Sequence, residues 1–209
     1  MEIIPQELQE ALIELFSIYG LAEESFKKTQ EILSKLDISP LNEFRYCSRN
    51  LIEFLRIAVS QEDDIDKLKK IIQQATHAAK NALNDCLDLA VDRAAAELGR
   101  LRDIDKEKDL SYYVPNEKEV KGAIGVLHDK IAESRRDLVQ RVEVYRQLYD
   151  SEAFKIIAAF ANKQNLKSIE ERIRIDERHM TRDTRRFWLT IVIGLLGIAG
   201  LSNLAKLLG

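Results

Sequence analysis

Hydrophobic residues recur every three or four positions along most of this chain, which is the period of an amphipathic helix. The first run covers about 5–38, with Pro5 in its first turn. Ser39-Pro40 is expected to end it, because the residue before a proline disfavours helical geometry. Later runs predict helices at about 41–59, 65–102, 116–149 and 151–186. The pattern predicts an all-α fold, a bundle of long antiparallel helices.

The third predicted helix carries small residues at three successive positions of its apolar face, Ala75, Ala79 and Ala82. Small side chains let helices approach closely, so we expect this helix to lie at the centre of the bundle. Arg93 falls on the same face, and we interpret it as paired or with its charge reaching solvent. The charged run that begins at Asp103 and extends to Asn116 breaks the period and predicts a long loop.

The C-terminal pattern differs, because Phe187 to Ala205 forms a run of roughly 19 uncharged residues, close to the number that crosses a bilayer core as a helix. Phe187 and Trp188 lie at its boundary, where aromatic residues are common in membrane proteins. Its glycines would weaken a water-soluble helix but suit closely packed membrane helices. The sequence predicts a bundle at 1–186, a single transmembrane helix at 187–205 and a tail at 206–209, with a buried helix of a soluble bundle as the alternative for 187–205.

Charge then gives the expected orientation. The 209 residues contain 32 Lys and Arg against 35 Asp and Glu, a formal net charge of −3, which is not typical of a general nucleic-acid binder. The N-terminus has no basic region or long apolar run, so no signal peptide is expected. Because arginines precede the predicted span, we expect a single-pass protein of the inner membrane with 1–186 in the cytoplasm. Cys47 and Cys86 are then expected to be reduced thiols.

Motifs for metal or cofactor chemistry are absent from the sequence. It contains no phosphate loop, no His-Glu-x-x-His and no Cys-x-x-Cys, so we expect neither a cofactor nor a metal. His77 and His128 have no partner at the spacing of a helical metal site and are interpreted as surface residues.

Arginines concentrate just before the predicted span. On a helix Arg174, Arg178, Arg182 and Arg185 share one face, and Arg186 follows directly. One interpretation is a solvated stalk in which interleaved acids neutralise the arginines. The functional alternatives are contact with anionic lipid headgroups or, if several copies assemble, a ring of positive charge at the mouth of a pore.

The same segment carries a resemblance to a known family. Arg174-Ile175-Asp176-Glu177-Arg178-His179 has the Arg-x4-His spacing of HEPN domains, and Arg172 to His179 has the longer spacing of that family. HEPN domains are small all-helical bundles that often cleave RNA as dimers, so the resemblance implies Arg174 and His179 as candidate catalytic residues. Isoleucine follows each arginine here, where the family usually has a polar residue. With a helical domain and one span, the chain also resembles membrane effectors of bacterial anti-phage systems, including CRISPR-accessory proteins in which such a domain assembles a pore.

Three hypotheses follow. The leading one is a non-enzymatic, tail-anchored effector that binds membrane lipid, associates with further copies of itself and forms or gates a pore. The second is a membrane-tethered scaffold for a cytoplasmic protein, and the third is a HEPN-type enzyme acting on RNA. For the effector, we predict that the anchors meet through the small-residue face formed by Thr190, Gly194, Gly197 and Gly200.

Overall fold

The computed structural model describes residues 5–32, 38–60, 64–104, 110–136 and 140–208, with the backbone alone at 104 and over 192–208. Over these ranges the chain is helical and contains no strand, which confirms the all-α prediction. The chain divides into two compact units, Met1–Leu166 and Lys167–Gly209. The arginine-rich segment lies in the second unit, whereas the sequence pattern groups it with the bundle in one domain over 1–186.

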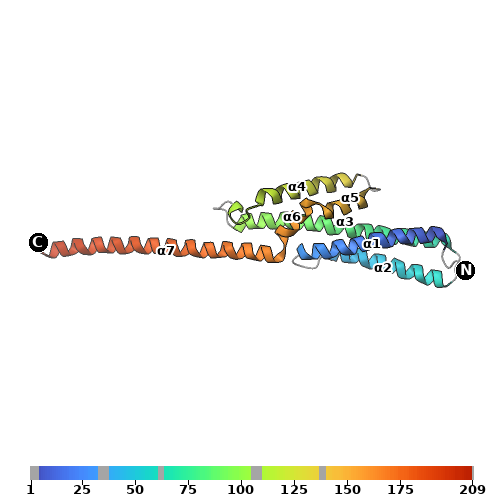
Figure 1. Ribbon diagram of the computed structural model, residues 1–209. Coiled ribbons are helices and arrows are strands. Elements are labelled where there is room, and N and C mark those ends of the chain that lie inside the picture. The colour runs from blue at the N-terminus through green and yellow to red at the C-terminus, as the bar shows by residue number, and fades with distance from the viewer. Residues whose placement is uncertain (1–4, 33–37, 61–63, 105–109, 137–139, 209) are drawn as a thin grey trace. The chain divides into compact units, whose positions relative to one another are not determined.

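The N-terminal part of the first unit consists of α1 (Gln6–Ile32), α2 (Ile38–Val59) and the first half of α3 (Ile65–Ile104). Both α1 and α2 pack along α3 (Figure 1). The predicted alanines are completely buried on α3, which brings the three backbones together. Aliphatic and aromatic side chains fill the rest of this core, among them Leu8, Leu15, Phe54, Ile57 and Ile72.

The start of α2 differs from the prediction. α2 begins at Ile38, so Ser39 and Pro40 lie in its first turn and do not end the preceding helix. Proline is accepted there, because the first N–H groups of a helix have no acceptor within it. The Ser39 hydroxyl donates a hydrogen bond to Asp85 of α3 at 2.7 Å, which fixes this turn. Residues 33–37 of the first predicted helix lie outside the described residues.

The second half of α3 is covered by α4 (Glu117–Ser134), α5 (Arg141–Asp150) and α6 (Glu152–Ala161), as Figure 1 shows. The prediction of a central third helix is thus confirmed. The predicted loop before α4 contains a short 3-10 helix, η1 (Leu110–Tyr112). In this half of α3 the buried side differs from the predicted apolar face that contains Arg93, because α4, α5 and α6 cover another side of the helix. The buried residues there include Ala90, Val91, Ala94, Leu98 and Leu101. Arg93 lies at the edge and forms an ion pair with Glu97, as its interpretation requires.

Two predicted helices are each divided in the structure. The predicted helix at 116–149 is divided into α4 and α5, which run in opposite directions (Figure 1). α4 ends at Ser134, whose buried hydroxyl donates to the Ile131 carbonyl at 2.8 Å. The predicted helix at 151–186 is interrupted at Asn162, whose backbone is extended. The Asn162 side chain accepts a hydrogen bond from the Gln164 N–H at 2.9 Å and so caps the next helix, a preference that asparagine shares with few residues.

That next helix, α7 (Lys163–Leu208), continues without a break through the arginine-rich segment and into the apolar segment. Among the described residues, no helix combines the length and the apolar character that crossing a membrane requires. Most of the predicted anchor, 192–205, lies outside the residues whose side chains the structure describes.

Candidate functional site

The candidate site from the sequence lies on α7. Helical geometry places Arg174, Arg178, Arg182 and Arg185 on one side of this helix with Arg186 at its edge, and all five side chains are exposed. We call this set the arginine face. Its backbone is regular: the hydroxyls of Thr181 and Thr190 donate to carbonyls one turn earlier, Glu177 and Arg186, at 2.8 and 2.9 Å. The helix therefore presents the arginines as one row.

Acidic neighbours are missing from the middle of this row. The positions three and four residues from Arg178, Arg182 and Arg185 hold no aspartate or glutamate, whereas Arg174 has acids at these positions. Within the described part of α7, no ion pair engages any member of the arginine face. The interpretation as a neutralised, salt-bridged stalk therefore does not hold for the central arginines. Arginines at i and i+4 repel each other, so an external anion would stabilise this arrangement.

Exposed hydrophobic residues follow the arginine face directly. Phe187, Trp188 and Leu189 are each more than half exposed, and the rings of Phe187 and Trp188 contact edge to face with centroids 6.2 Å apart. A row of arginines followed by aromatic side chains is the order found where a helix passes from headgroups into the apolar layer of a membrane. This order is the strongest functional feature of the second unit.

The HEPN-type residues lie on the same helix. Arg174 and His179 are exposed, and five residues of helix separate their directions by about 140°. Arg172 and His179 are seven residues apart and lie on one side of the helix. Arg174 points away from both. The structure therefore does not bring Arg174 and His179 together within one chain.

The predicted packing residues of the anchor are only partly described. The Thr190 side chain is exposed. Gly194, Gly197 and Gly200 lie outside the residues whose surroundings the structure describes. The small-residue face remains a prediction.

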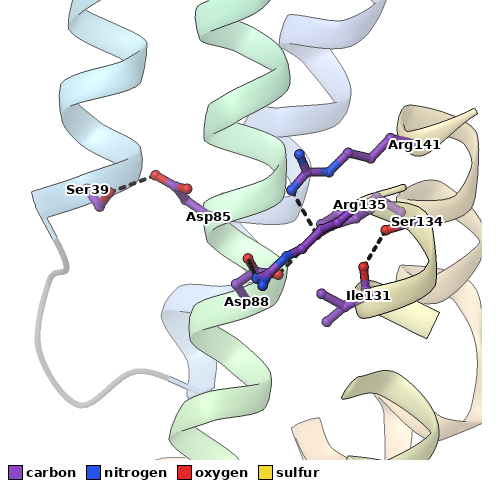
Figure 2. A network of polar contacts seen from close by, with 8 residues as sticks. Ser39, Asp85, Asp88, Ile131, Ser134, Arg135 and Arg141 are labelled. Carbon is purple, nitrogen blue, oxygen red and sulfur yellow. Dashed lines mark hydrogen bonds and ion pairs between the residues drawn. The ribbon is translucent and has the colours of Figure 1, made fainter. Parts of the chain in front are cut away.

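A polar junction in the first unit was not predicted. Asp88 of α3 accepts a hydrogen bond from the Tyr145 hydroxyl at 3.0 Å and pairs with Arg135 at 2.7 Å (Figure 2). Arg141 lies one turn before Tyr145, with its guanidinium carbon 5.3 Å from the centre of the Tyr145 ring. Burial raises the pKa of Tyr145, so this hydroxyl remains a donor to Asp88. The junction attaches α5 and the end of α4 to α3.

Two buried glutamates reinforce the same part of the bundle. Glu97 pairs with Arg93 and, at 2.6 Å, with Arg100. Glu117 pairs with Lys121 at 2.5 Å and with Arg102 at 2.9 Å. The hydrogen bond from Lys121 lowers the pKa of Glu117, against the effect of burial, and Arg102 lowers it further. Each of the two carboxylates thus pairs with two basic side chains, which offsets the cost of burying its charge.

Neither the cysteines nor the remaining histidines add a reactive site. Cys47 and Cys86 are buried free thiols, and burial raises their pKa values to about 11 and about 12. His77 and His128 are exposed on α3 and α4, as interpreted from the sequence. No cluster of three or more potential metal ligands is found among the described residues. Comparison with protein-family models, curated proteins and solved structures finds no match to this chain.

Proposed function

We propose that the protein is a membrane-attached effector whose C-terminal helix enters the bilayer at 187–205 and whose arginine face contacts anionic headgroups. The observation that carries this proposal is the row Arg178, Arg182 and Arg185, which has no acid three or four residues away on the helix and precedes exposed aromatic residues. Each basic residue near an anionic membrane surface contributes about 1 kcal/mol of attraction. Guanidinium groups also bind phosphate oxygens in pairs of hydrogen bonds, which suits lipid phosphates.

The effector acts by association of several copies, which would bring the anchors side by side and form or gate a pore with a rim of arginines. This activity matches that of the anti-phage membrane effectors which the sequence resembles. A scaffold that holds another protein at the membrane is the second candidate. The oligomeric state separates the two, because only the effector requires several copies.

The test uses the full-length protein reconstituted into vesicles. We expect the protein to resist carbonate extraction and to release an entrapped dye from vesicles of phosphatidylcholine with phosphatidylserine, and much less from phosphatidylcholine alone. The double variant Arg178→Gln/Arg182→Gln should lower dye release from the anionic vesicles several-fold. The matched control, Lys167→Gln/Arg172→Gln, removes two charges from the same helix on the N-terminal side of the arginine face and should leave release near that of the wild type.

Two results would overturn the proposal. Complete extraction by carbonate would exclude the anchor, and equal dye release by all variants from both vesicle types would exclude the arginine face. Firm attachment without any dye release would favour the scaffold over the effector.

A further inference from the structure

An unusual number of large hydrophobic side chains is exposed on α1 and α2. Ile13 and Phe16 of α1 and Ile52 and Leu55 of α2 are each more than half exposed, and Val59 is 80% exposed. The spacing of Ile52, Leu55 and Val59 is three and four residues, so they form a stripe on one side of α2. This stripe points away from the buried side chains of the same helix, such as Phe54 and Ile57. α2 is therefore apolar on two sides, and only one of them is covered in the single chain.

The stripe on α2 and the exposed pair on α1 lie on the two helices that pack side by side on α3. α1 and α2 run antiparallel, and both pack on α3 (Figure 1). Phe44 contacts Tyr19 and Phe26 edge to face, with centroids 5.3 and 5.7 Å apart. Further along, the half-buried Leu12 and Leu51 cover the core from the two helices. The exposed Phe16 and Leu55 lie one turn from these leucines, toward solvent.

The outer borders of α1 and α2 carry opposite charge. On α1 the outer border holds Glu10, and this helix has an excess of acidic residues. On α2 the outer border holds Arg45 and Arg49, and this helix has an excess of basic residues. A hollow between α2 and α3, lined in part by Arg45, Arg49 and Ile71, adjoins the basic border. When two copies of such a surface meet about a two-fold axis parallel to these helices, α1 of one faces α2 of the other, and acid meets base on both sides.

We propose that the outer surface of α1 and α2 is where two copies of this chain associate, with Phe16 and Leu55 at its centre. The inference rests on the proposed self-association and names the surface that performs it. The apolar stripes exclude water from each other, and the oppositely charged borders fix the antiparallel orientation. In the pair of copies, four helices bury apolar sides that the single chain leaves exposed.

The test measures the mass of the full-length protein in detergent by sedimentation equilibrium over a series of concentrations. We expect the wild type to associate, and Leu55→Glu and Phe16→Glu to raise the dissociation constant about tenfold or more, as for residues at the centre of an interface. Val126→Glu is the matched control, because Val126 is a comparably exposed apolar residue on a helix outside this surface. Circular dichroism checks that each variant keeps its helix content.

Charge reversal provides a second test that does not touch the apolar centre. Arg49→Glu and Glu10→Arg should each weaken association, and their combination should restore it, because acid and base exchange sides. A monomeric wild type at every concentration would overturn the proposal, as would unchanged association of Leu55→Glu and Arg49→Glu. The proposal would also be overturned if Val126→Glu dissociated as readily as Leu55→Glu. A wild-type protein that binds a different helical protein but not a second copy of itself would assign this surface to that other partner.

The surface and the membrane attachment can fail independently. Association of Leu55→Glu and Arg49→Glu equal to that of the wild type, together with normal carbonate resistance and dye release, would refute this surface alone. Loss of attachment with normal association in detergent would refute the membrane proposal alone.

Discussion

Tyr145 donates a hydrogen bond to Asp88 at 3.0 Å, although the two residues are 57 positions apart and the Tyr145 ring is completely buried. The ring packs in the core while the hydroxyl reaches the partly exposed carboxylate at the edge of α3. Arg135 holds the other oxygen of the same carboxylate at 2.7 Å. One aspartate thus connects α3 to both α5 and the end of α4.

Tyr145→Phe removes the hydroxyl and keeps the ring. We expect the free energy of unfolding to fall by about 1 kcal/mol, the usual contribution of one hydrogen bond, or somewhat more because the acceptor is charged. Urea unfolding followed by circular dichroism measures this difference. Tyr46→Phe is the control, since Tyr46 is exposed on α2, and an equal loss in both variants would argue against a special role for Tyr145.

Glu117 gives the bundle a predictable dependence on pH. Its pKa in the folded protein is lowered, mainly by the hydrogen bond from Lys121. The ionised carboxylate therefore adds stability that is complete above its unfolded pKa of about 4.3 and is lost as the pH falls through the lower folded value. Glu117→Gln should be less stable than the wild type at pH 7, and the difference should shrink toward acid pH. Urea unfolding at a series of pH values measures it, and a difference independent of pH would contradict this account.

The buried thiols should be unreactive in the folded protein. Burial raises the pKa of Cys47 to about 11 and that of Cys86 to about 12, and only the thiolate attacks alkylating reagents. At pH 8 we expect iodoacetamide to modify neither cysteine until urea unfolds the bundle, as mass spectrometry of the labelled protein would detect. Rapid modification of Cys86 without urea would mean that α3 separates from its neighbours in solution.

The geometry of α7 predicts the outcome of an RNA cleavage assay. Because Arg174 and His179 point about 140° apart on one helix, we expect purified protein to leave single-stranded RNA intact. A general acid or base usually contributes about 100-fold or more to the rate, so an active site would be evident from substitution. Cleavage that needs no metal and disappears in both His179→Ala and Arg174→Ala would revive the HEPN interpretation, with the second copy completing the site.

Helix periodicity predicted the all-α class, the central position of α3 and the arginine face, because each depends on residues close in sequence. It missed the division at Asn162, since a single capping side chain decides whether two helices join, and the apolar period continues on either side. The shifted burial in the second half of α3 was also missed, because it depends on which helices cover it.

The polar junction could not have been predicted for the same reason. Asp88, Arg135 and Tyr145 are ordinary residues of their own helices, and nothing in the local pattern pairs them. By contrast, the missing acids around Arg178 and Arg182 could have been found from the sequence alone, by listing the residues three and four positions away. That signal was available and would have argued against a neutralised stalk.

The last prediction concerns how the anchors meet in the membrane. Gly194 and Gly197 share one side of the predicted span with Thr190, and Leu195 points largely the other way. In lipid no hydrophobic force draws helices together, so association depends on close packing at small residues. Gly194→Leu and Gly197→Leu should insert normally, since leucine favours the bilayer more than glycine does, but should lower dye release from anionic vesicles. Leu195→Ala is the control on the opposite side and should change release little. If both glycine variants release dye like the wild type, the anchor only tethers the bundle, and the scaffold becomes the better account of the protein.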